Sequence, residues 1–164
     1  MAKLAREQLV EFSSECSLPA ALEVVGERWA FLILRSAFLG MRHFEDFQST
    51  LGIARNILAD RLARFVERGI MERRPVPDDR RRVEYRLTEK GWALTPTLVA
   101  LRQWGERWET GTTAQPVLVD VADGLPVREV TVQSHDGRVL GKGDMRWAVE
   151  GSAEDGGAPA KAGA

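Results

Sequence analysis

Hydrophobic residues recur with helical spacing through most of the first 110 positions of the chain. Residues 28–39 are apolar nearly all round, which predicts a helix buried at the centre of a domain. An earlier helix is expected around Pro19, since proline is tolerated in a first turn. A third helix starting near Arg42 would bury Phe44 and Phe47 on one face. These patterns predict a small helical core.

The stretch from 52 to 88 combines a further helix with a hairpin. Three apolar residues, at spacings of four and three, share one face of that helix: Leu58, Leu62 and Phe65. The helix is expected to end at Gly69, because glycine readily adopts the left-handed conformation. Residues 70–75 and 83–87 then suit two strands around a tip rich in proline, aspartate and arginine. Two helices joined by a short turn and followed by a hairpin outline a winged helix-turn-helix.

The next predicted helix begins after Thr88, which suits an N-cap, and runs to about Glu109. It carries more apolar and aromatic surface than so small a domain needs for its own core, which predicts a subunit interface. We expect a homodimer whose interface contains one residue of the N-terminal arm and four of this helix: Phe12, Leu98, Leu101, Trp104 and Trp108.

The composition changes after Gly111. Residues 116–150 are rich in valine and contain two Asp-Gly pairs, of which Asp136-Gly137 suits a hairpin turn. Four short strands are expected there: 117–121, 127–133, 138–140 and 145–149. The last residues are of low complexity, which predicts disorder. The expected organisation of this α+β chain is an N-terminal arm (1–15), a winged-helix DNA-binding and dimerisation domain (16–110), a small β-rich extension (116–150) and a disordered tail (151–164).

Charge is distributed unevenly although the net charge is only −1. Residues 40–90 hold 12 lysines and arginines against nine acidic residues, whereas residues 111–164 hold five against eight. The basic excess therefore falls on the predicted helix and hairpin. No apolar run is long enough to cross a membrane, and the first residues contain no hydrophobic signal core. The cytoplasm is the expected location, and no membrane partner is expected.

Arginine and asparagine at the start of the fourth helix suit base recognition in a DNA major groove. Arg55 and Asn56 lie there, and the small Ala59 would allow close approach of the backbone. A solvated helix face would explain the same residues. The hairpin tip adds weight to the DNA interpretation, because Asp79 could orient Arg81 towards a minor groove. The expected DNA-contacting residues are Arg42, His43, Arg55, Asn56, Ala59, Arg61, Arg64, Asp79, Arg80, Arg81 and Arg82.

The single cysteine, Cys16, lies just ahead of a predicted helix, where the positive end of the dipole favours a thiolate. A redox sensor is one interpretation of this position, and an idle thiol is the other. One cysteine and two separated histidines cannot form a metal cluster, and no nucleophile motif or phosphate-binding loop is present. We therefore expect no catalytic residues, no metal and no cofactor.

These features together resemble the HxlR family of bacterial transcriptional regulators, within the wider MarR-like group. The matching stretches are CSLPAAL (16–22), GERW (26–29), LILR (32–35), RHF (42–44), GIARNILADRL (52–62), YRLTEKG (85–91) and WGERW (104–108). The resemblance implies a homodimeric winged helix that represses or activates genes from a pseudo-palindromic double-stranded operator. In several members a cysteine at the position of Cys16 senses oxidants.

Two departures from the family bear on the interface. Ala54 replaces the usual capping serine, and DRRR at 79–82 resembles the MarR-type wing instead of a Pro-Pro-Arg run. Two further hypotheses stay open. A small-molecule effector could bind at the dimer interface near Trp29 and Trp104. Alternatively, the chain could be a protein-interaction module whose acidic β extension is the working surface.

Overall fold

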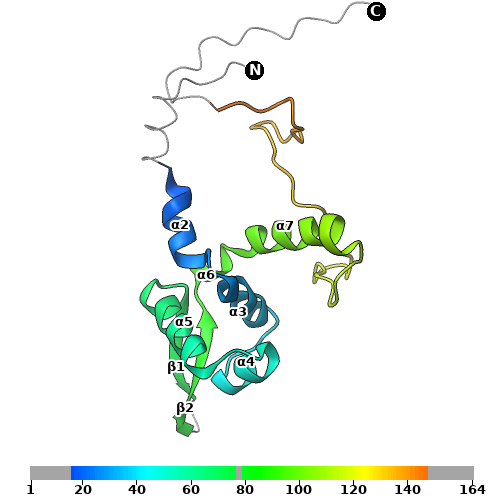
Figure 1. Ribbon diagram of the computed structural model, residues 1–164. Helices are drawn as coiled ribbons and strands as arrows, with labels where there is room; N and C mark the ends of the chain where they lie inside the picture. The colour runs from blue at the N-terminus through cyan, green and yellow to red at the C-terminus, as the bar shows by residue number, and fades with distance from the viewer. Residues whose placement is uncertain (1–15, 77–78, 148–164) are drawn as a thin grey trace, which may run out of the picture. The chain divides into compact units, whose positions relative to one another are not determined.

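The computed structural model describes residues 16–76 and 79–147, with residues 79–81 described by their backbone alone (Figure 1). The predicted arm with Phe12 and the predicted disordered tail lie outside these residues. The elements, in order, are α2 (Ser17–Val25), α3 (Arg28–Phe38), α4 (Phe44–Leu51), α5 (Arg55–Glu67), β1 (Met71–Val76), β2 (Asp79–Leu87), α6 (Glu89–Trp92), α7 (Thr95–Gly105) and the π-helical η1 (Glu106–Thr110). This order is the winged helix-turn-helix that the sequence predicts.

The core lies where α3, α4 and α5 meet beside the first residues of β1. Its fully buried large side chains come from each of these elements: Ile33, Leu34, Phe47, Leu58, Leu62, Phe65 and Met71. The predicted apolar face of α5 is therefore confirmed. Even Ser36, in the middle of α3, is buried, and its hydroxyl donates to the Leu32 carbonyl at 3.0 Å. A helix surrounded in this way explains why residues 28–39 are apolar on all sides.

The turn between α4 and α5 depends on Gly52, which ends α4 with φ of +60°. This left-handed conformation is one that glycine adopts without steric cost. Ala54 occupies the N-cap of α5 and contributes no capping hydrogen bond from its side chain. The first-turn N–H groups of α5 thus receive no capping bond from this position.

Strands β1 and β2 form an antiparallel hairpin, with Met71 opposite Leu87 and Arg73 opposite Tyr85. Its outer end projects beyond α4 and α5, as expected for a wing (Figure 1). The hairpin is tied to the helical core at its base. Thr88 accepts a hydrogen bond from the Gly91 N–H at 3.2 Å, which confirms its predicted capping role. The Thr88 hydroxyl also donates to the Gly69 carbonyl at 2.6 Å, at the end of α5.

The prediction of one continuous helix from Thr88 to Glu109 is wrong. The chain makes a single turn, α6, then turns at Ala93 and Leu94 before α7 begins. Pro96 in the first turn of α7 has no N–H to donate to the Trp92 carbonyl, and Thr95 donates its hydroxyl there instead at 2.6 Å. The helix therefore restarts at Thr95, and α7 extends away from the core (Figure 1).

The four strands predicted after residue 116 do not form ladders in the part that the structure describes. Two isolated β-bridges are present, Val119 with Pro126 and Gln133 with Val139. The physical reason is that nearly all side chains between 117 and 147 are exposed, so these short segments have no buried face to stabilise a sheet. The predicted Asp136-Gly137 turn is confirmed, with Gly137 at φ of +83° and its N–H donating to the Ser134 carbonyl at 3.0 Å.

Among the described residues, those up to 130 and those from 131 to 147 belong to two separate compact units. Residues 111–130 fall in the same compact unit as the winged helix, and the predicted division into a domain at 16–110 and an extension at 116–150 stays a prediction. None of the described helices is both long and apolar enough to cross a membrane.

Candidate nucleic-acid interface

The N-terminal end of α5 presents three of the predicted DNA-contacting residues. Arg55, Asn56 and Ala59 are all exposed there. The Arg55 guanidinium lies over the Phe44 ring, 4.9 Å from its centroid, so a cation–π contact orients it at the start of α4. Ala63, one turn later, is exposed as well. Small side chains beside an arginine and an asparagine leave room for a groove edge to approach this helix.

Two other predicted contacts, Arg61 and Arg64, lie further along α5, and their role at DNA stays a prediction. Both guanidinium groups turn towards the junction of α2 and α3, where each forms an ion pair with Glu27. Arg64 also donates to the carbonyl of Glu23 at 3.3 Å. Glu27 is not predictable from the sequence, because its partners are 34 and 37 residues away and no local pattern links them.

The wing contributes a second basic surface. Arg82 is exposed on β2, as predicted. Arg73 and Arg74 on β1 are exposed too and were missed, although the run Glu-Arg-Arg in the first predicted strand could have indicated them. Arg74 pairs with Glu72 of its own strand at 2.6 Å. The side chains of Asp79, Arg80 and Arg81 are outside the description, so their pairing stays a prediction.

Arg42 and His43 join the helix-turn-helix to the wing. The Arg42 carbonyl accepts from the Tyr85 N–H at 2.8 Å, and the His43 Nδ1 lies 3.3 Å from the Val83 carbonyl oxygen. Glu84 lies 4.0 Å from the other ring nitrogen of His43. The main cause of a lowered Glu84 pKa is its hydrogen bond from Arg86, at 2.7 Å, with nearby positive charge adding to it. Arg42 and His43 therefore position the wing, and both side chains are only partly exposed.

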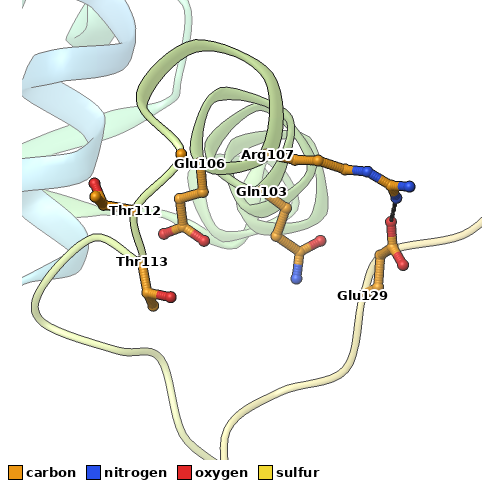
Figure 2. A pocket seen from close by; sticks show the side chains of 7 residues that line it. Gln103, Glu106, Arg107, Thr112, Thr113 and Glu129 are labelled. Carbon is orange, nitrogen blue, oxygen red and sulfur yellow. Dashed lines mark ion pairs between the residues drawn. The ribbon is translucent and has the colours of Figure 1, made fainter.

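A different hollow, of about 340 Å³, opens beside η1 (Figure 2). Its lining is polar: Gln103, Glu106, Arg107, Gly111, Thr112, Thr113 and Glu129. These groups hold the following chain segment in place. The Gln103 amide donates to the Arg128 carbonyl at 3.1 Å and accepts from the Val130 N–H at 2.8 Å, while Arg107 pairs with Glu129 at 3.6 Å. The hollow is not lined by Trp29 or Trp104, where an effector pocket was predicted.

The remaining predicted residues are Cys16 and those of the predicted dimer interface. Cys16 is exposed at the N-cap of α2. Leu101, Trp104 and Trp108 are exposed on α7 and η1, and Leu98 is partly buried. Among the described residues no group of three or more histidine, cysteine, aspartate or glutamate side chains is placed to hold a metal ion. The structure thus brings together a helix end and a wing, and leaves a separate apolar face on α7.

Comparison with known proteins relates this arrangement to one family. Residues 24–113 match the family described as HxlR-like helix-turn-helix. An HTH-type transcriptional regulator of Mycobacterium tuberculosis, Rv3095, is 46% identical over 101 residues, which are 62% of this chain and 64% of that protein. The regulator YodB of Bacillus subtilis is 32% identical over 98 residues, covering 58% of this chain and 88% of YodB.

The same relationship is found among solved structures. The reduced form of YodB superposes with a TM-score of 0.51 at 29% identity, over 58% of this chain and 94% of YodB. The crystal structure of PA1607, assigned as a candidate transcription factor, has a TM-score of 0.74 at 42% identity, over 81% of this chain and 94% of PA1607. The larger coverage means that the likeness to PA1607 continues beyond the helix-turn-helix domain.

Proposed function

Since this chain belongs to the HxlR-like helix-turn-helix family of transcriptional regulators, we propose that it binds a pseudo-palindromic operator as a homodimer. In this proposal α5 enters the major groove by its N-terminal end, and the wing contacts the flanking backbone or minor groove. The observation that carries it is the shared exposure of Arg55, Asn56 and Arg82 on a helix-turn-helix and its hairpin. The chain acts by binding and not by catalysis, in the compartment of the chromosome, the cytoplasm.

Each contact has its own role in this proposal. Asparagine can form two hydrogen bonds with adenine, so Asn56 is assigned to base recognition. Arg82, on the wing, is assigned to the phosphate backbone. Loss of Asn56 should cost about 1–3 kcal/mol at one base position, whereas loss of Arg82 should weaken binding to all sequences and reduce the salt dependence.

An electrophoretic shift tests the proposal, with DNA from upstream of the chain's own gene and duplexes selected from a random pool. Binding should weaken steeply with salt, in proportion to the phosphates contacted. The variants are Asn56→Ala and Arg82→Ala, and Arg128→Ala is the matched control because it removes an exposed arginine far from α5 and the wing in the sequence. A flat salt profile, or equal loss with the Arg128 control, would contradict the proposal. Failure to bind any duplex would favour the protein-interaction alternative.

The proposal of a homodimer rests on the exposed apolar side chains of α7 and η1. Two-fold symmetry would present two α5 helices to two half-sites, which a single copy of α5 does not. An effector that binds the dimer stays part of this proposal without an assigned pocket.

We further propose that oxidants regulate DNA binding through Cys16. This thiol is exposed at the start of α2, and YodB, a relative, has been solved in a reduced form. Treatment with diamide should reduce the operator affinity of the parent, and Cys16→Ser should be insensitive. The same response in both proteins would remove Cys16 from the mechanism.

A further inference from the structure

Glu27 contacts α5, the helix proposed to enter the major groove, on the side that faces α2 and α3. It lies in the turn between α2 and α3 and occupies the N-cap of α3, but its carboxylate makes no capping bond there. One carboxylate oxygen pairs with an Nη atom of Arg61, and the other lies 3.4 Å from an Nη atom of Arg64. With the bond from Arg64 to the Glu23 carbonyl, these contacts fasten α5 to both α2 and α3.

The position of Arg61 around α5 excludes it from the outward face. A helix advances about 100° per residue, so Arg61 lies about 60° from the buried Leu58 and about 140° from the exposed Asn56. Its side chain is 18% exposed, and its Nε is buried without a hydrogen-bond partner. An arginine in this position can fix the rotation of the helix about its axis, but it cannot reach the same groove edge as Asn56.

The turn that carries Glu27 is itself tightly fixed. The Gly26 N–H donates to the Leu22 carbonyl at 2.7 Å, which closes α2. A Cβ atom at Gly26 would lie 2.5 Å from that carbonyl oxygen, so the turn excludes any side chain. The Glu27 carbonyl then accepts from the Ala30 N–H at 3.0 Å as α3 begins. Glu27 is therefore presented to α5 by a backbone with little freedom to move.

We propose that Glu27 is a positioning residue for DNA recognition, which sets the orientation of α5 through Arg61 and Arg64 and does not itself contact DNA. This inference rests on the proposed function, because it concerns how the operator is bound. It reassigns Arg61 and Arg64 from phosphate contacts to internal supports. It predicts that the ion pair of Glu27 with Arg61 is needed for tight binding of the correct operator sequence. The same ion pair should contribute little to the electrostatic attraction of any duplex.

Operator affinity over a salt series tests the assignment, with a duplex selected by binding as one probe and a random duplex of equal length as the other. The variants are Glu27→Gln, Arg61→Gln and the double variant. Glu23→Gln is the matched control, since it removes the same charge nearby but keeps the carbonyl that Arg64 uses. Thermal unfolding of each protein establishes that it is folded at the assay temperature.

We expect each single variant to bind the selected duplex about tenfold more weakly, a change of about 1.4 kcal/mol, and the double variant to be no weaker than either. In all these variants the salt slope and the affinity for the random duplex should equal those of the parent protein. The Glu23→Gln control should equal the parent in its affinity for both duplexes and in its salt slope. Where Glu27→Gln does not fold, Arg64→Gln takes its place. It removes the more exposed ion pair and the bond to the Glu23 carbonyl but keeps the pair of Glu27 with Arg61, so it should show a smaller loss with the same slope.

The opposite pattern would overturn the assignment. Tighter binding by Glu27→Gln, with a salt slope lowered by about one in Arg61→Gln, would mean that these arginines contact phosphates and that Glu27 competes for them. Additive losses in the double variant would also overturn it. Absence of binding by the parent protein to any duplex overturns the proposed function instead, and is distinguishable from both results.

Discussion

The exposed face of α7 allows a quantitative prediction about dimerisation. Trp104 of α7 is 53% exposed and Trp108 of η1 is 66% exposed, and α7 extends away from the core (Figure 1). A tryptophan side chain presents roughly 200 Å², so about 100 Å² of Trp104 is available to a partner. At about 25 cal/mol per Å², its burial contributes about 2.5 kcal/mol in each protomer. A two-fold dimer buries two copies, for a total of about 5 kcal/mol.

Trp104→Ala should therefore raise the dimer dissociation constant by up to roughly 1,000-fold to 10,000-fold. This is an upper limit, because some of the area will remain wet and buried area converts incompletely to affinity. Sedimentation equilibrium over a range of protein concentrations measures the constant directly. The variant should be monomeric at concentrations where the parent is a dimer.

Trp92→Ala is the matched control. Trp92 is equally exposed, at 52%, but it lies on α6 and its ring makes an edge-to-face contact with Phe38 at 5.0 Å. Its loss should lower the free energy of unfolding and leave the dissociation constant unchanged. A parent and a Trp104→Ala protein with the same dissociation constant would refute the assignment of α7 to the interface, as would equal dissociation of the Trp92 control.

Two predictions concern residues at the wing and at its base, where it joins the helical core. Gly91→Ala should destabilise the protein by about 1–3 kcal/mol in urea titrations, because the new Cβ would lie 2.3 Å from the Ile70 carbonyl oxygen. The control is Gly105→Ala, whose new Cβ meets no atom within 4 Å and which should be neutral or stabilising. Equal effects of the two substitutions on the free energy of unfolding would contradict this reasoning. The Glu84 pKa is lowered from 4.5, chiefly by Arg86, so the stability that it contributes is present above pH 4.5 and lost as pH falls through the lower folded value. Glu84→Gln should melt below the parent at pH 7 in low salt. The difference should shrink as the pH is lowered from 4.5 and should also shrink in 1 M NaCl, whereas a difference unchanged by pH would exclude Glu84 as its source.

Much of the winged helix could be predicted because its signals are local. Helix α5 follows from the spacing of Leu58, Leu62 and Phe65, and the hairpin follows from two short strands around a polar tip. The capping role of Thr88 could be predicted from residue type and position alone. In each case the residues that determine the structure are within a few positions of one another, so their pattern is visible in the chain.

The features that could not be predicted depend on contacts between residues that are distant in sequence. The valine-rich residues after 116 have strand propensity, but a strand needs a partner and a buried face, and neither is encoded within the segment itself. Arg61 looked like a surface arginine because arginine is usually exposed. Its actual neighbour, Glu27, is distant in sequence and close only after α2, α3 and α5 have packed together. Contacts of this kind cannot be read from spacing.

If Glu27 positions α5 as proposed, Arg61 does not add to the surface that recognises an operator. With Arg61 only 18% exposed and paired to Glu27, α5 has Arg55, Asn56 and Ala59 exposed at its N-terminal end, followed by Asp60, whose negative charge is unfavourable near phosphates. About one and a half helical turns can contact only a few base pairs. The specificity of a genomic operator requires more contacts than this, because competing sites are numerous. Two copies of α5 in a dimer, each supported by its wing, would supply them. The exposed apolar face of α7 and the inward position of Arg61 thus support the same proposal, that the protein binds its operator as a dimer.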